Sequence, residues 1–116
     1  MTRPAQGILV ENAVIANGGT VSTAVDLGDM SVAGIITPVM TGTALTFQVS
    51  VDGSAYYVLH DSTKTAVTVT VDGTARAFYL TPQIFAGWRY VKVVSGSAEG
   101  AERTIKVIAV QAASKR

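Results

Sequence analysis

One short pattern occurs twice in this chain. Residues 49–53 read Val-Ser-Val-Asp-Gly, and residues 69–73, twenty positions later, read Val-Thr-Val-Asp-Gly. In each copy, apolar and polar residues alternate before and after the Asp-Gly pair. Alternation with a period of two is typical of a β-strand with one buried face, and Asp-Gly is typical of the tight turn between two antiparallel strands. The pattern therefore predicts two hairpins, with turns at Asp52-Gly53 and Asp72-Gly73.

Similar runs, bounded by Gly, Asn, Asp or Pro, recur along the chain and predict about nine short strands. In the clearest of them, Leu45, Phe47, Val49 and Val51 are expected to face the core. Short strands at regular spacing, with turn signals between them, indicate an all-β fold, an antiparallel β-sandwich. The expected strands are residues 7–16, 20–27, 31–38, 44–51, 55–60, 66–71, 75–80, 88–94 and 103–111.

One short helical turn is predicted near residues 82–86. Thr81 is a suitable N-cap, and Pro82 suits the first helical position because proline has no N–H to leave unpaired there. Gly87 suits the position just past the end of the turn.

The length and composition indicate one domain with few surface charges. A chain of 116 residues is large enough for one hydrophobic core and too small for two. We expect a single β-sandwich domain over residues 8–111, an N-terminal arm at 1–7 and a frayed tail at 112–116. Only 15% of the residues are charged, against about 25% in ordinary soluble domains. This shortage of charge suggests that neighbouring molecules cover part of the surface.

Charge and hydrophobicity argue against nucleic-acid and membrane partners. The formal net charge is +1 and the basic residues form no run, so no nucleic-acid partner is expected. Residues 30–51 carry no charge and are long enough to cross a bilayer, but Gly34, Pro38 and Gly42 interrupt them and their second half alternates with a period of two. We interpret this segment as strands and expect no membrane partner.

Residues able to support catalysis are few and poorly spaced. His60 is the single histidine, and its neighbour Asp61 is expected to point to the opposite face of a strand, where it could not orient the imidazole. No Gly-x-Ser-x-Gly motif occurs. We therefore expect no enzymatic activity, no cofactor and no specific metal site. The residues considered and set aside as calcium ligands or paired acids are Asp26, Asp29, Asp52, Asp61, Asp72, Glu11, Glu99 and Glu102.

Two strands are apolar on both faces. In 103–111, Ile105, Val107 and Ala109 share one face while Ile108 and Val110 share the other, and 7–16 has the same character. Such a strand is either buried between two layers or exposed where another subunit binds.

The sequence resembles two families. The first is the discoidin or galactose-binding-like jelly-roll. This resemblance is carried by Val25-Asp26-Leu27-Gly28, the run Val32–Ile36, the run Phe47–Gly53 followed by Tyr56-Tyr57, and Trp88-Arg89-Tyr90-Val91-Lys92-Val93. This resemblance implies a jelly-roll-like β-sandwich and carries no ligand residues with it.

The second resemblance is to small structural proteins of tailed phages, including capsid decoration (cement) proteins. It is carried by Leu27-Gly28, the alternating strand that ends at Asp52-Gly53, and Pro82-x-x-Phe85-Ala86-Gly87-Trp88-Arg89-Tyr90. It implies a non-enzymatic virion protein, made in the host cytoplasm and located on the phage head. The implied partners are other virion proteins, the major capsid protein above all, and further copies of the chain in a homo-oligomer such as a trimer.

Two hypotheses remain open on how such a protein would act. The arm Thr2–Gly7, with Arg3, Pro4 and Gln6, is a candidate partner-binding segment, the alternative being simple terminal disorder. The second functional hypothesis is a carbohydrate-binding or host-surface-binding module of a tail or baseplate, with Tyr56, Tyr57 or Trp88 at an exposed rim. Packing of these aromatic residues and of Tyr90 in the core or at a sheet edge is the competing interpretation.

Overall fold

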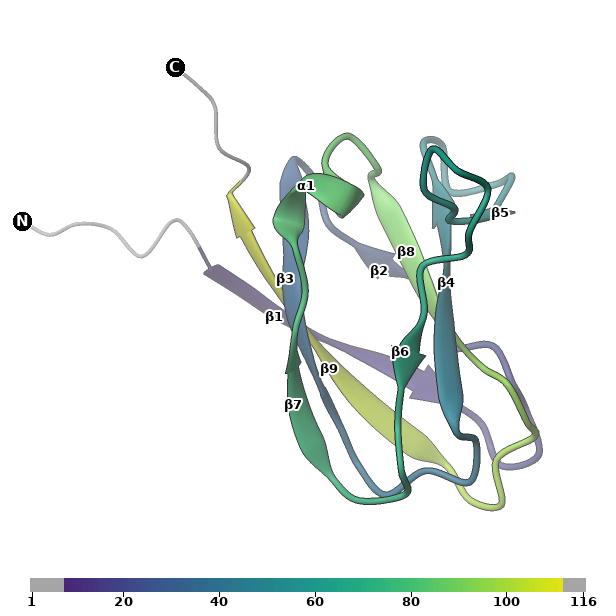
Figure 1. Cartoon of the computed structure of the whole chain (residues 1–116). Coiled ribbons are helices and arrows are strands. Elements are labelled where there is room, and N and C mark those ends of the chain that lie inside the picture. Colours follow the sequence, from purple (N-terminus) through teal and green to yellow (C-terminus); the bar gives the residue numbers. More distant parts are fainter. Residues whose placement is uncertain (1–7, 112–116) are drawn as a thin grey trace, which may run out of the picture.

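In a computed structural model that describes residues 8–111, the chain forms two antiparallel β-sheets packed face to face (Figure 1). Sheet A has the strand order β1 (Ile8–Ile15), β9 (Arg103–Gln111), β3 (Met30–Thr37) and β7 (Arg76–Tyr79). Sheet B has the order β2 (Val25–Asp26), β8 (Tyr90–Ser95), β4 (Ala44–Ser50) and β5 (Tyr57–Val58), and β6 (Val69–Thr70) also pairs with β4. The predicted antiparallel β-sandwich is confirmed.

The core lies between the two sheets and is built by alternate residues of the central strands. Leu45, Phe47 and Val49 of β4 are 0–1% exposed, as the alternation predicts. Val51 was expected to join them but is 65% exposed, because β4 ends at Ser50 and the chain turns there.

The helical turn α1 (Pro82–Phe85) closes one end of the core. Pro82 begins it, and Gly87, just past its end, has the positive φ of +92° that favours glycine. Thr81 occupies the N-cap position without a side-chain cap hydrogen bond. The Phe85 ring is fully buried and meets Phe47 edge to face, with 5.2 Å between the ring centroids.

The first predicted hairpin is confirmed. β4 pairs with β5 through Gln48 opposite Val58 and Val49 opposite Tyr57. At the turn, Gly53 has a φ of +78°, and the Asp52 carboxylate accepts hydrogen bonds from the backbone N–H groups of Ser54 and Ala55.

The second predicted hairpin is wrong. Gly73 does have a turn conformation, with a φ of +88°, but the strands on either side of it belong to different sheets. β6 pairs with β4 in sheet B, whereas β7 pairs with β3 in sheet A. The Asp72 carboxylate binds the Arg76 guanidinium at 2.7 Å as the chain crosses between the layers. The Asp-Gly pair therefore forms the turn, but it does not decide which strands pair.

The uncharged segment Met30–Val51 supplies β3 to one sheet and β4 to the other. Within residues 8–111, no helix has the length and hydrophobicity needed to cross a membrane. The arm at 1–7, with Arg3, Pro4 and Gln6, and the tail at 112–116 lie outside the described residues.

Candidate docking surface

The two strands that are apolar on both faces, β1 and β9, lie side by side. Their register runs without interruption from Ile8 opposite Val110 to Ile15 opposite Arg103. One face of the pair packs into the core, where Ala13, Ile15 and Ile105 are fully buried. The other face points away from sheet B, so the structure places it on the outside of the sandwich.

Residues from β3 and β7 continue this outer face across sheet A. Residues that stand opposite each other in a sheet share a face, so the strand registers define rows of outward neighbours. These rows are Ile8, Val110 and Ser31; then Val10, Ile108, Gly34 and Tyr79; then Asn12, Lys106, Ile36 and Ala77. We call this set the outer face of sheet A.

The outer face of sheet A is largely apolar, and four of its large side chains are open to solvent, whereas Ser31 in its first row is 1% exposed. Exposed fractions are 84% for Tyr79, 65% for Ile8, 53% for Val10 and 40% for Ile36. Lys106 is the one charged residue in the three rows. With strands about 4.8 Å apart and residues rising about 3.4 Å, four strands over three rows cover roughly 400 Å². Apolar patches of this size on a monomer are often functional.

The outer face of sheet B has a different character. Its outward residues on β4 and β8 include Thr46, Gln48 and Lys92, which are polar. The Lys92 ammonium lies 4.2 Å from the centre of the Tyr56 ring, so this aromatic side chain is covered by a cation. Val94 and Val58 also lie on this face, which is nevertheless the more polar of the two outer faces.

The four aromatic residues considered for sugar stacking are separated by the fold. Trp88 is half-buried and packs against the core, and Tyr56 and Tyr90 are also half-buried. Tyr57, on β5, is 68% exposed. Of the four, Tyr57 presents the one widely open ring.

The acidic and histidine side chains bind their own loops. His60 is exposed, and its Nδ1 lies 3.0 Å from the Val58 carbonyl oxygen. The Asp61 carboxylate accepts hydrogen bonds from Thr63 and Thr65, and the Thr63 hydroxyl is the largest cause of the lowered pKa of Asp61. Among the described residues, no three His, Asp or Glu side chains converge closely enough to hold a metal ion.

An open groove of about 450 Å³ lies between the start of β1 and the loop after β2. Leu9, Leu27 and Met30 contribute apolar surface to it. Its polar wall is an ion pair in which Arg89 Nε lies 3.1 Å from Asp26 Oδ1, and the hydrogen bond from Arg89 is the main reason why the pKa of Asp26 is lowered. This carboxylate is already paired and is not poised for proton transfer.

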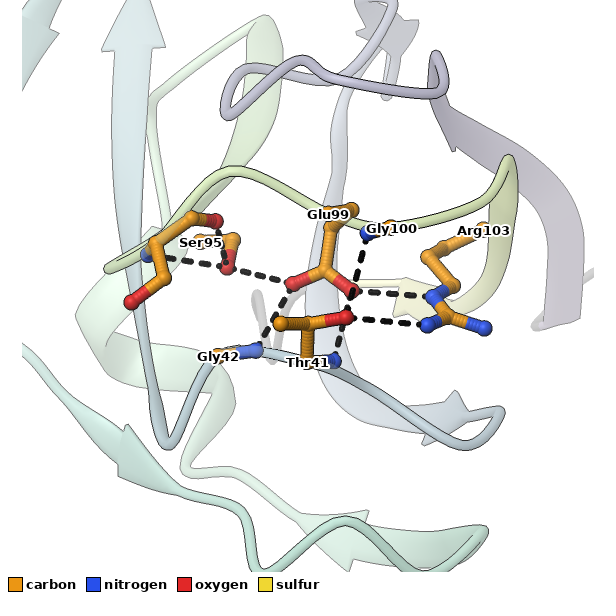
Figure 2. Close-up of polar contacts among 7 residues, drawn as sticks. Thr41, Gly42, Ser95, Glu99, Gly100 and Arg103 are labelled. Atoms are coloured by element: carbon orange, nitrogen blue, oxygen red, sulfur yellow. Dashed lines mark hydrogen bonds and ion pairs between the residues drawn. The ribbon is translucent and has the colours of Figure 1, made fainter.

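A buried carboxylate, which the sequence pattern did not identify, joins the loops at one end of the sandwich (Figure 2). Glu99 is 1% exposed, although it lies in the stretch 95–102 that looks most loop-like in the sequence. Its Oε1 accepts hydrogen bonds from the Thr41 N–H at 2.7 Å and the Arg103 Nε at 2.9 Å. Its Oε2 accepts hydrogen bonds from the Gly42 N–H at 2.9 Å and the Ser95 hydroxyl at 2.7 Å.

These four hydrogen bonds decide the charge state of Glu99. Burial acts to raise its pKa, but the hydrogen bonds from Thr41, Ser95 and Gly42 outweigh burial and lower the pKa from 4.5 to about 2. The backbone of Glu99 also donates to the Gly19 carbonyl and accepts from the Gly18 N–H. Because every carboxylate oxygen is bound by two donors, we assign Glu99 to structure rather than to acid–base chemistry.

Comparison with known proteins gives a likeness at the level of the fold. No protein-family model matches the chain, and no curated protein sequence matches it. Among solved structures, it is similar to the SPBc2 prophage-derived protein YomS, with a TM-score of 0.51 and 12% identity over 94% of this chain and 99% of YomS. The two chains share a fold.

Two carbohydrate-binding modules also align with the chain. One is CBM32-1 from a family 31 glycoside hydrolase of Clostridium perfringens, with a TM-score of 0.47 and 12% identity over 86% of this chain and 75% of the module. The other is chitosan-binding module 1 from a chitosanase/glucanase of Paenibacillus sp. IK-5, with a TM-score of 0.46 and 20% identity over 85% of this chain and 74% of the module.

Proposed function

We propose that this chain is a non-enzymatic structural protein of a tailed-phage virion, which docks on the capsid and stabilises it. The observation that carries the proposal is the apolar outer face of sheet A, set against the polar outer face of sheet B. The docking partner is another virion protein, with the major capsid protein as the first candidate. The docking surface is the set of rows that contains Val10, Ile36 and Tyr79.

The physical reason is the free energy of exposed apolar surface. Covering roughly 400 Å² at about 25 cal/mol per Å² yields at most about 10 kcal/mol. Association itself costs on the order of 4–15 kcal/mol in lost motion, so one copy on one site binds weakly. A repeating lattice, such as a capsid, offers many equivalent sites and suits a protein that acts in many copies.

Two further findings support a phage setting. One of the solved structures that match this chain over nearly its full length is a prophage-derived protein. The segment from Pro82 to Tyr90 resembles that of small structural proteins of tailed phages. Neither finding identifies the partner, which is why the assignment to the capsid is our proposal.

The test is quantitative mass spectrometry of purified virions of the phage that encodes the chain. We expect the chain at a copy number comparable with that of the major capsid protein. Its absence from purified virions, or a copy number typical of a tail tip, would overturn the capsid assignment.

The exposed ring of Tyr57 favours a second candidate function, binding of carbohydrate on a host surface. Exposed tyrosine rings stack on apolar faces of ligands, and this ring is 68% open. A glycan array tests this alternative with the purified protein. Saturable binding that disappears on Tyr57→Ala would favour a tail or baseplate module, whereas no hits together with a capsid-like copy number would favour the capsid role.

A further inference from the structure

The strand β1 is the longest edge strand among the described residues. It has eight residues, whereas the other strands at the ends of the two sheet orders have four (β7) or two (β2 and β5). An edge strand exposes a row of backbone N–H and C=O groups that can pair with another strand. The length of an edge therefore sets how much pairing it can support.

Only the second half of the β1 edge is covered. The Val14 N–H donates to the Thr23 hydroxyl at 3.0 Å, and the Thr23 N–H donates to the Val14 carbonyl at 2.9 Å. The backbone groups of Val14 thus point away from β9, and strand geometry gives Val10 and Asn12 the same direction. Within the described part of the chain, Ile8–Asn12 has no backbone hydrogen bonds on this side.

The open half of β1 also lacks the features that protect natural edges. Lysine, proline and bulges commonly block edge pairing. Residues 8–12 contain no lysine and no proline, and the register with β9 runs from Ile8 to Ile15 without a shift. The one charged residue, Glu11, shares the face of Ala13 and Ile15 and so does not point into the edge.

We propose that a second copy of this chain pairs with this edge, β1 against β1, so that the two A sheets form one continuous antiparallel sheet. The two copies are related by a two-fold axis that passes between their Val10 residues. Val10 then lies opposite Val10 of the second copy, and Ile8 lies opposite Asn12 of the second copy. Each of the three pairs exchanges two N–H···O bonds, about six in all.

The side chains select this register over its neighbours. An axis at Glu11 would place the two Glu11 carboxylates directly opposite each other, which is destabilising. An axis at Leu9 would pair only Ile8, Leu9 and Val10 of the described edge and would leave Asn12 unmatched. The register centred on Val10 pairs all five residues from Ile8 to Asn12 and keeps the Glu11 carboxylates apart.

The dimer would also enlarge the apolar surface of the protein. In an antiparallel pair, opposite residues share a face, so the outer faces of both A sheets lie on the same side. Their joint area is roughly 800 Å², which is about what one partner buries in a standard protein–protein interface. This inference does not depend on the proposed function. If the proposed function holds, the dimer offers the capsid twice the apolar surface that one copy offers.

Disulfide formation by single-cysteine variants of the purified full chain tests the dimer. The chain has no cysteine, so a single Cys can bond only to the same residue of another copy. In a hydrogen-bonded antiparallel pair the Cα atoms are about 5.5 Å apart, within the range that a disulfide spans. Mild oxidation of Val10→Cys should give a covalent dimer.

Asn12→Cys is the matched control. It lies on the same edge and the same face, but in the proposed register the two Cα atoms are about 14 Å apart, too far for a disulfide. We expect at least tenfold slower dimer formation than for Val10→Cys. Equal rates for the two variants, or cross-linking through Asn12→Cys alone, would overturn the proposal.

A second measurement does not rely on cysteine. Val10→Pro removes an N–H that points into the open edge and spares the hydrogen bonds to β9, so the fold should persist, as circular dichroism would confirm. Sedimentation equilibrium should show a dimer for the wild type and at least tenfold weaker self-association for Val10→Pro. A wild type that stays monomeric at its highest soluble concentration would refute the dimer and leave the virion measurement of the proposed function unaffected.

Discussion

The Glu99 carboxylate accepts a 2.9 Å hydrogen bond from the backbone N–H of Gly42, a residue 57 positions earlier in the chain. Thr41 and Gly42 lie in the loop from β3 to β4, and Glu99 lies in the loop from β8 to β9. Each loop crosses from one sheet to the other, so this contact ties the two crossover loops together. A charged acceptor in a buried site forms strong hydrogen bonds, and the loss of such an acceptor leaves its donors unpaired.

Replacement of Glu99 is expected to destabilise the protein. Glu99→Gln keeps the shape of the side chain but removes the charge and aims an NH₂ group at backbone donors, at a cost of about 2–4 kcal/mol. Chemical denaturation would measure this change. Glu102→Gln, at an exposed position in the same loop, is the control and should stay within about 0.5 kcal/mol of the wild type. A similar small effect at both positions would contradict the structural role of Glu99.

The low pKa of Glu99 predicts a specific dependence of stability on pH. The folded-state pKa of about 2 lies below the unfolded value near 4.5, so the ionised carboxylate stabilises the fold above that unfolded value. This contribution, about 3 kcal/mol, is lost as the pH falls from about 5 to 2. The stability difference between the wild type and Glu99→Gln should therefore shrink over this range. A difference that is constant with pH would exclude Glu99 as the titrating group.

Gly42 is expected to tolerate no side chain. A Cβ atom at this position would overlap the Ser95 hydroxyl and come within 3.3 Å of Glu99 Oε2. Gly42→Ala should therefore displace the Ser95 hydroxyl and destabilise the fold by about 1–3 kcal/mol. Gly100→Ala is the control, because its Cβ would meet Thr41 Oγ1 at an ordinary 3.5 Å. Thermal denaturation of the two variants should separate them, and equal melting temperatures would contradict close packing of Gly42 against Ser95.

The helical turn α1 is expected to be held by a single side chain. Phe85→Ala removes a fully buried ring that packs against Phe47, which should cost about 3–5 kcal/mol. The neighbouring Ile84 is 39% exposed, and Ile84→Ala should cost far less. Denaturant titration of both variants measures the contrast, and comparable losses would show that α1 is anchored in another way.

Local pattern was sufficient for the fold class and most elements. Alternation placed Leu45, Phe47 and Val49 in the core because a half-buried strand imposes a period of two wherever it occurs. The same local signal failed at Asp72-Gly73, where the chain turns but then changes sheets. A turn motif reports backbone conformation over a few residues, whereas strand pairing depends on the whole topology.

The candidate docking surface was predictable only in part. The two-sided apolar pattern of β1 and β9 pointed to a contact surface, but Ile36 and Tyr79 join it only through the registers of β3 and β7. No sequence pattern indicates the hydrogen bonds of Glu99. Two of its partners, Gly42 and Thr41, lie 57 and 58 residues away, and a glutamate in a loop is ordinarily exposed. The predicted contacts of Arg3, Pro4 and Gln6 lie outside the described residues and stay a prediction.

The outer face of sheet A is tested most directly by a matched pair of double variants in the phage. Ile36→Thr with Tyr79→Thr makes this face more polar. Val58→Thr with Tyr57→Thr makes comparable changes on β5 of sheet B at similar exposure (40% and 84% against 44% and 68%). Incorporation into purified virions should fall at least tenfold for the sheet A pair and stay unchanged for the sheet B pair. Equal incorporation of both pairs, or a loss confined to the sheet B pair, would contradict docking through sheet A.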